Sequence, residues 1–213
     1  LQDSFVNTPT ITIAGSVNEL HPGGLWVNGV AAYLADGVFS VTGVPLFEGP
    51  NAIKVRTSDL AGHEASATVS IMLDTVPPAI TIVAPSGGAL VRTAQLAVSG
   101  EVSEIDALVK VNGSAANVTG AGFHLTSLTL AEGENVITAG ATDRAGNSGA
   151  ASVSVTVDST APAKPVVNQP ASPTNVSVIG VTGVAEANAE VMLTIATGPT
   201  TTVLTTRATE QGL

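Results

Sequence analysis

Two stretches of the chain carry nearly the same pattern: TSDLAGHEASATVSIMLDTVPP at residues 57–78 and ATDRAGNSGAASVSVTVDSTAP at residues 141–162. In both, an aspartate precedes an Ala-Gly pair, an alternating apolar run follows, and a second aspartate leads into proline. In the second stretch Val153, Val155 and Val157 alternate with Ser and Thr, which predicts a β-strand with one buried and one solvated face. Self-similarity at a fixed spacing indicates a repeated structural unit.

The similarity covers most of two units at a constant offset of 84 residues. Residues 26–41 align with residues 110–125, and the match continues without a gap to Pro78 and Pro162. Further upstream, ITIAGSV and LAVSGEV match with a slip of one residue, and a third copy begins in VIGVTGVAE. That third copy stops before it reaches an Asp-x-Ala-Gly stretch. We therefore predict two nearly complete units, the first without its opening strand, and one partial unit, with these boundaries: 1–77 (repeat 1), 78–161 (repeat 2) and 162–213 (partial repeat 3).

Each unit reads as short strands separated by turn residues. The Asn-Gly pairs at 28–29 and 112–113 lie between apolar runs, and this dipeptide favours a two-residue type I′ hairpin. In the first hairpin Trp26 then lies opposite Ala31, and Val27 points into the core. No stretch has a sustained helical period, so the fold class is all-β, with a Greek-key β-sandwich in each unit. Short proline-containing linkers join the units and are expected to be semi-rigid.

The composition excludes several classes of function. Charged residues make up 11% of the chain, and the net charge is −10 with no cluster of Lys and Arg, so we expect no nucleic-acid partner. The chain contains no cysteine, which excludes disulfides, thiolate metal sites and cysteine nucleophiles. No apolar run is long enough to span a membrane, so we expect no membrane insertion in this segment. The first residue is Leu1 rather than Met, and we expect the sequence to be part of a longer protein.

The motifs of repeat 2 carry a family resemblance. They are Val111-Asn112-Gly113, Phe123, Glu132-Gly133-Glu134-Asn135, Asp143-Arg144-Ala145-Gly146-Asn147 and Val157-Asp158. This pattern resembles the bacterial immunoglobulin-like (Ig-like) tandem repeats, and in particular the glucodextranase-type Ig-like modules of bacterial surface and secreted proteins. Repeat 1 departs from it at His63, where the family usually has Asn, and at Leu73-Asp74.

The resemblance implies a location and two alternative functions. It implies an extracellular or cell-surface protein in which tandem Ig-like domains act as a non-enzymatic rigid spacer, stalk or adhesive shaft. The partners would be neighbouring Ig-like domains of the same longer chain, with a host or matrix protein or a glycan as a further partner. The alternative is a carbohydrate-binding accessory region of a secreted glycan-degrading enzyme, in which Trp26 and Tyr33 would form an aromatic platform. For these two aromatic residues, packing beneath a loop or against a neighbouring domain is the other interpretation.

The repeated aspartates allow a metal site or a structural role. Ca²⁺ takes six to eight oxygen ligands, and the candidates are Asp59 with Asp74 and Asp143 with Asp158. The alternative is turn chemistry, in which an aspartate accepts hydrogen bonds from the backbone of its own turn. We favour the second interpretation and expect no cofactor.

Catalytic residues are not expected in this chain. The three histidines, His21, His63 and His124, do not recur between the units, and we expect ordinary surface side chains. No nucleophile or phosphate-binding motif is present.

Overall fold

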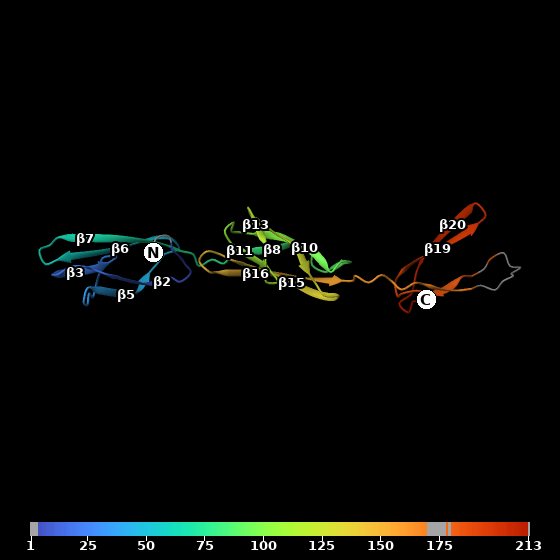
Figure 1. Cartoon of the computed structure of the whole chain (residues 1–213), viewed down its shortest axis with the longest axis horizontal. Helices are drawn as coiled ribbons and strands as arrows, with labels where there is room; N and C mark the ends of the chain where they lie inside the picture. Colours follow the sequence, from blue (N-terminus) through green and yellow to red (C-terminus); the bar gives the residue numbers. More distant parts are fainter. Residues whose placement is uncertain (1–3, 170–177, 179, 213) are drawn as a thin grey trace. The chain divides into compact units, whose positions relative to one another are not determined.

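The computed structural model describes residues 4–169, 178 and 180–212 (Figure 1). The chain divides into two compact units, Leu1–Asp158 and Ser159–Leu213. The regular structure of the described residues consists of strands, which confirms the all-β prediction. Among these residues, no helix is long and apolar enough to cross a lipid bilayer.

Repeat 1 forms the first half of the first unit. Its strands are β1 (Ser4–Val6), β2 (Thr10–Ser16), β3 (Pro22–Val27), β4 (Val30–Ala32), β5 (Val38–Pro45), β6 (Gly49–Asp59) and β7 (Glu64–Leu73). One sheet has the order β1-β7-β6-β3-β4, and the other consists of β2 and β5. Figure 1 shows β6 and β7 on one side of this repeat and β2 and β5 on the other. β1 is parallel to β7, whereas the other pairs are antiparallel.

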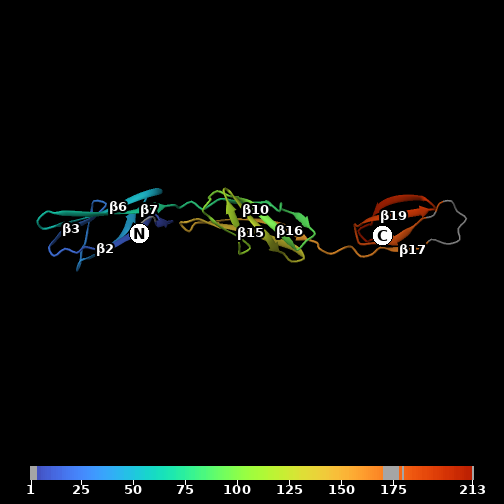
Figure 2. The same ribbon diagram turned by 45° about the horizontal axis from the view of Figure 1, so that its top comes forward.

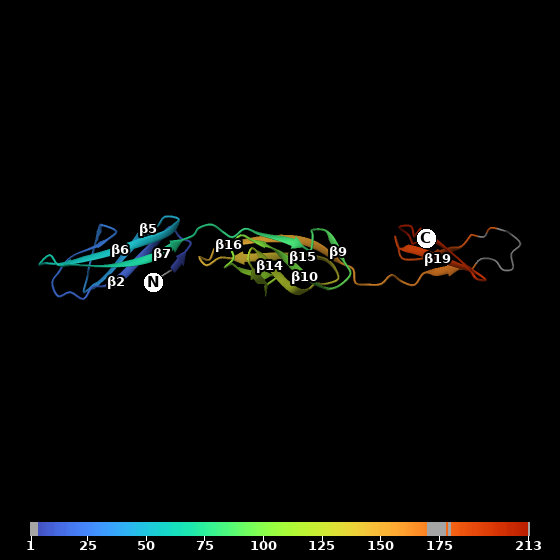
Figure 3. The same cartoon turned by 90° about the horizontal axis from the view of Figure 1, so that it is seen from above.

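Repeat 2 has the same arrangement with a larger second sheet. Its strands are β8 (Ile80–Ala84), β9 (Ala89–Val91), β10 (Gln95–Val102), β11 (Leu108–Val111), β12 (Ser114–Ala115), β13 (Asn117–Thr119), β14 (Gly122–Thr129), β15 (Gly133–Thr142) and β16 (Ser148–Val157). The sheets have the orders β12-β11-β15-β16-β9 and β13-β14-β10-β8. Seen from above in Figure 3, β9, β15 and β16 lie on one side and β10 and β14 on the other.

The cores follow the predicted alternation. On β16, Val155 and Val157 are buried while Thr156 between them is exposed. In repeat 2 the buried cluster comprises Ile80, Val98, Val102, Ala107, Val109, Val111, Phe123, Leu128, Leu130, Ile137, Ala139, Ala141, Val155 and Val157. The cluster of repeat 1 is smaller and comprises Ile13, Val27, Val44, Leu46, Ile53, Ile71 and Leu73. Because the inner faces of the two sheets of each sandwich meet in such a cluster, burial of these apolar side chains is the main contribution to the stability of the fold.

The Asn-Gly hairpins are also confirmed. Asn28 and Gly29 have φ angles of 49° and 81°, and Asn112 and Gly113 have φ angles of 45° and 85°, as a type I′ turn requires. Trp26 pairs with Ala31 across the first hairpin, and Val27 is buried in the core, as predicted.

The described residues of the second unit form two antiparallel strand pairs. Its strands are β17 (Val166–Asn168), β18 (Thr182–Val184), β19 (Glu190–Thr197) and β20 (Thr200–Arg207). β17 pairs with β18, and β19 pairs with β20 (Figure 2). Gly183 lies on β18 beside β17, in the same way as Gly100 lies on β10 beside β8.

Candidate functional site

The turn at Asp143–Asn147 is held by several side-chain hydrogen bonds, and we call it the junction turn. Asp143 is only 7% exposed. Its Oδ1 accepts hydrogen bonds from the backbone N–H groups of Gly146 (2.7 Å) and Asn147 (2.8 Å), and its Oδ2 accepts one from Asn147 Nδ2 (2.8 Å). Gly146 adopts a φ of 94°, which favours glycine at this point. Asp143 therefore accepts hydrogen bonds from the backbone of its own turn, as the turn interpretation expects.

The pKa of Asp143 reflects the same contacts. Burial acts to raise the pKa of this carboxyl group, because a charge is less stable away from water. The hydrogen bonds from the side chain of Asn147 and from the turn backbone outweigh burial and leave the pKa below its ordinary value. The carboxylate is thus held in its charged form by the turn that it organises.

The junction turn belongs to repeat 2 but contacts the end of repeat 1. Asn147 Nδ2 donates a hydrogen bond to the backbone carbonyl of Asp74 (2.7 Å). The guanidinium of Arg144 lies over the ring of Phe5, 4.2 Å from its centroid. A cation above an aromatic face is attracted by the ring quadrupole. Two side chains of one turn therefore hold two separate segments of the preceding repeat.

Three carboxylates gather at this contact, and we call them the junction carboxylates: Asp74, Glu104 and Asp143. One oxygen atom from each lies within 4.8 Å of the others. The pKa of Glu104 is raised, first by burial and then by the negative charges of Asp143 and Asp74. A hard cation such as Ca²⁺ prefers oxygen ligands of this kind, but it needs six to eight of them. Both oxygens of Asp143 already accept N–H hydrogen bonds, and Asp74 Oδ1 accepts one from Val76 N–H (3.1 Å).

The structure does not bring together the pairs that the sequence suggested. In the β6–β7 hairpin Gly49 lies opposite Leu73 and Ser58 opposite Glu64, so Asp59 and Asp74 lie at opposite ends of the hairpin. The equivalent register of β15 and β16 separates Asp143 from Asp158 in the same way. The contact that forms instead joins Asp74 of repeat 1 to Asp143 of repeat 2.

Glu104 was missed by the sequence reasoning. The slip of one residue that aligns ITIAGSV with LAVSGEV also aligns Glu19 with Glu104, and this recurrence could have identified it. Asp158, the fourth candidate, is exposed, and its backbone N–H donates to Val91 O (2.9 Å). In the same way, Asp74 N–H donates to Val6 O (2.9 Å). Each of these two aspartates thus follows the end of a strand and forms a backbone hydrogen bond with the edge strand that runs parallel to it.

The equivalent turn of repeat 1, Asp59–His63, is more open. Asp59 Oδ1 accepts a hydrogen bond from His63 N–H (2.8 Å), and Asp59 Oδ2 lies 2.7 Å from His63 Nδ1. The hydrogen bond with Asp59 is the main cause that raises the pKa of His63, and the reciprocal bond lowers the pKa of Asp59. The His63 side chain is 84% exposed. His21 and His124 are exposed as well.

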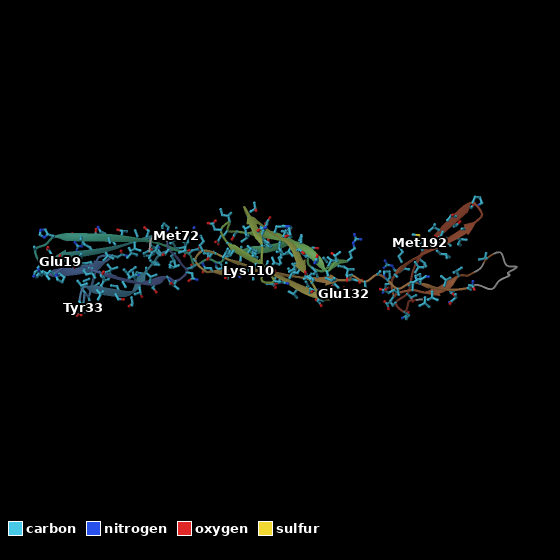
Figure 4. All side chains as sticks on the ribbon, viewed as in Figure 1. Glu19, Tyr33, Met72, Lys110, Glu132 and Met192 are labelled. Carbon is cyan, nitrogen blue, oxygen red and sulfur yellow. The ribbon has the colours of Figure 1, made fainter. Side chains whose placement is uncertain are left out.

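The two aromatic candidates lie in different environments. The ring of Trp26 is covered by the guanidinium of Arg56, at 4.4 Å from its centroid, and packs against Gly24 so closely that a Cβ there would overlap it. β4 ends at Ala32, so the hairpin pairing does not reach Tyr33. Tyr33 is 83% exposed and projects away from the sheets (Figure 4). Trp26 therefore has a structural partner on its face, whereas Tyr33 is open to solvent.

The two similar sandwiches, with the end of one bonded to a turn of the next, define a tandem Ig-like protein. The chain belongs to the family described as glucodextranase, domain B, whose model matches residues 2–75 and again residues 78–159. This finding confirms the resemblance seen in the sequence motifs.

Several known proteins are similar to the chain. Bacillopeptidase F of Bacillus subtilis (strain 168) is 32% identical over 153 residues, which are 68% of this chain and 10% of that protein. The chain thus spans about a tenth of this relative. Among solved structures, the fibronectin(III)-like modules of Clostridium thermocellum CbhA match with a TM-score of 0.45 and 16% identity, over 73% of this chain and 88% of that one. A tetra-tandem repeat from the extending region of a large adhesion protein matches with a TM-score of 0.36 and 20% identity, over 99% of this chain and 63% of that one.

Proposed function

We propose that this chain is a non-enzymatic spacer within a longer bacterial protein at the cell surface or outside the cell. Its Ig-like repeats hold other parts of that protein at a fixed separation, and their partners are the neighbouring Ig-like domains of the same polypeptide. Membership of a family named for one domain of a larger enzyme supports this role. The match to a tenth of Bacillopeptidase F agrees with a module that occurs inside longer chains.

The observation that carries the proposal is the bonding of the linker between the repeats. β7 ends at Leu73 and β8 begins at Ile80, so the connection is short. At its start, the N–H and hydroxyl of Thr75 donate to the carboxylate of Glu48 in repeat 1 (3.1 and 2.9 Å). At its end, Ala79 N–H donates to Ser103 Oγ, and Ser103 N–H donates to Ala79 O, both at 2.9 Å.

The middle of the linker is also held in place. Pro77 and Pro78 restrict the backbone, and Pro78 is fully buried. The backbone of Pro78 passes so close to Gly149 that a Cβ at Gly149 would overlap the Pro78 carbonyl oxygen. Together with the hydrogen bond from Asn147 to Asp74, these contacts fix the linker along its length. A connection of this kind favours a stiff spacer over freely moving beads.

The titrating groups support a structural role. Among the described residues, shifted pKa values occur at Asp59, His63 and Asp143, where turn hydrogen bonds act on the pKa, and at Glu104, where burial and then the other junction carboxylates raise it. A catalytic site needs such groups to converge on a substrate with a nucleophile or base in reach. Here Asp59, His63 and Asp143 instead form hydrogen bonds within their own turns.

The test is the relative orientation of the two repeats in solution. Residual dipolar couplings of the backbone amides of repeats 1 and 2 are expected to fit one common alignment tensor. The double variant Arg144→Ser/Asn147→Ser removes the side chains that contact repeat 1, so separate tensors should then be needed. The matched control is Leu60→Ser/His63→Ser at the equivalent positions of repeat 1, which lie at the opposite end of the β6–β7 hairpin. If the unaltered chain already needs two tensors, the spacer proposal fails.

A further inference from the structure

A hollow lies on the outer face of the larger sheet of repeat 1, beside the junction turn. The inner face of this sheet carries the buried Ile53 and Ile71, so the side chains that alternate with them on β6 and β7 point to solvent. The hollow has a volume of about 460 Å³, and Met72 marks its place in Figure 4. Repeat 1 supplies a mostly apolar floor, and among the described lining residues only Arg144 of repeat 2 is charged. The lining includes Phe5, Pro50, Ala52, Ser70, Met72 and Arg144.

The guanidinium of Arg144 is held at this hollow by Phe5. It lies 4.2 Å from the centroid of the ring, and such stacking orients the planar group while its edges stay available to donate hydrogen bonds. Its ion pair with Asp106 is long, at 3.9 Å, and joins two exposed side chains, so it is weak. Arg144 therefore presents N–H donors in the fork geometry that fits a carboxylate.

A second cation continues the same face. Lys54 follows Ala52 by two residues on β6, so the two side chains point to the same side of the sheet, about 7 Å apart along the strand. Lys54 is exposed, and among the described residues its side chain forms no ion pair or hydrogen bond. Arg56, two residues further on, is instead paired with Glu64 and stacked on Trp26. The available positive charge of this face therefore lies at the hollow and directly beside it.

This positive charge contrasts with the rest of the chain. The net charge is −10, with only seven Lys and Arg residues in total. At the offset of 84 residues, the positions equivalent to Pro50 and Lys54 are Glu134 and Thr138 in repeat 2. The same face of repeat 2 thus has a carboxylate beside the equivalent place and lacks the lysine. Charge complementarity favours an anionic occupant on repeat 1 alone.

We propose that the hollow and Lys54 form a binding site for an acidic polysaccharide whose sugar units carry carboxylate groups. One carboxylate pairs with the guanidinium of Arg144, and a second one further along the polymer pairs with the ammonium of Lys54. The apolar face of a sugar ring packs on Met72, and the sugar hydroxyls bond to the exposed hydroxyls of Ser70 and Thr68. An apolar floor with a few placed polar groups is typical of a ligand site.

An acidic peptide is less suited to this face than a polysaccharide. A peptide strand binds through free backbone groups at the edge of a sheet, whereas β6 and β7 are paired with each other along this stretch. Only side chains are available to the ligand here. The site also differs from an aromatic platform of Trp26 and Tyr33, because its charged groups select the ligand. The inference uses the contact of Arg144 with Phe5 but does not depend on the spacer function.

The test is isothermal titration calorimetry of the full chain with sodium polygalacturonate. The methyl ester of the same polymer is the uncharged control, and poly-L-glutamate is the acidic peptide control. We expect binding of polygalacturonate that weakens as salt is added, and no binding of the ester. In NMR spectra the same titration should shift the amide signals of Ala52, Thr68 and Ser70, which lie between the two cations.

Two lysine variants show whether the polymer binds at the proposed place. Lys54→Gln removes a cation of the site without touching the junction and should weaken binding by about tenfold. Lys110→Gln removes an exposed lysine from the outer face of repeat 2 and should leave the affinity unchanged. The proposal is overturned if polygalacturonate does not bind, or if Lys54→Gln binds it as tightly as the parent chain. Equal binding of the methyl ester or of poly-L-glutamate would overturn it as well.

Discussion

Replacing Arg144 and Asn147 of repeat 2 with serine is expected to destabilise repeat 1. The hydrogen bond from Asn147 Nδ2 to Asp74 O, at 2.7 Å, contributes about 0.5–1.5 kcal/mol net. The stacking of Arg144 over Phe5, at 4.2 Å in a partly solvated place, contributes about 0.5–1 kcal/mol. The ion pair of Arg144 with Asp106, at 3.9 Å between exposed side chains, lies within repeat 2 and adds little. The free energy of unfolding of repeat 1 should therefore fall by about 1–2.5 kcal/mol.

The assay relies on the single tryptophan of the chain, which lies in repeat 1. Trp26 fluorescence during urea unfolding reports repeat 1, whereas repeat 2 contains no tryptophan or tyrosine. Repeat 1 has the smaller buried cluster, so we expect it to unfold while repeat 2 is still folded and able to bind it. With a urea dependence of about 1–3 kcal/mol per M, the midpoint should decrease by roughly 0.3–2.5 M.

The control is Lys110→Ser, which removes an exposed positive charge from β11 of repeat 2. It should leave the Trp26 transition in place. Asn147 also bonds to Asp143, so the double variant weakens repeat 2 as well, and circular dichroism measures that second effect separately. The reasoning is refuted if the Trp26 midpoint of the double variant equals that of the control.

Three further predictions concern Asn135, the pair of Asp59 and His63, and the junction carboxylates. Asn135→Ala removes hydrogen bonds to Ala131 N–H, Ala131 O and Gly133 O and should cost about 2–3 kcal/mol in urea unfolding of repeat 2 followed by circular dichroism; a cost below about 0.5 kcal/mol would contradict it. Because the pKa of His63 is raised, its contribution to stability is complete below its ordinary pKa of about 6.5 and is lost as pH rises through the folded value. Because the pKa of Asp59 is lowered, its contribution to stability is lost as pH falls through that lowered value. An NMR titration should therefore show a lower pKa for His63 in Asp59→Asn, and an unchanged value would count against the contact. For the junction carboxylates, exchanging about 1 mM Ca²⁺ for a chelator should move the unfolding temperature by less than ~1 °C, and a larger calcium-dependent rise would establish a metal site.

Much of the fold could be predicted from local sequence signals. The alternation at Val155 and Val157 identifies a half-buried strand because side chains of a strand point to opposite faces at every step. Asn28-Gly29 identifies its hairpin because both residues need positive φ. Each of these signals acts over a few residues, and the repeat offset shows that the same set of signals occurs twice.

The contacts of the candidate site depend on distant parts of the chain. Asp59 and Asp74 flank one strand in the sequence, but an extended strand separates its two ends in space. Asp74 instead meets Asp143 because the turn of one repeat contacts the end of the preceding one. Neither alternation nor turn chemistry specifies which end of a sandwich faces its neighbour. The contacts of the linker between the repeats determine which ends face each other.

The contacts at the junction are asymmetric, because the two repeats contribute different groups to them. The turn of repeat 2 supplies Arg144 and Asn147, and repeat 1 supplies Phe5 and the carbonyl of Asp74, so the contribution to the stability of repeat 1 comes from the repeat that follows it. The stability of a tandem array is approximately the sum of the intrinsic stabilities of its repeats and of nearest-neighbour interface contributions of this kind. Because repeat 1 has the smaller core, the same interface energy is a larger fraction of its stability than of that of repeat 2. A substitution in the junction turn is therefore expected to destabilise the preceding repeat in addition to the repeat that contains the turn.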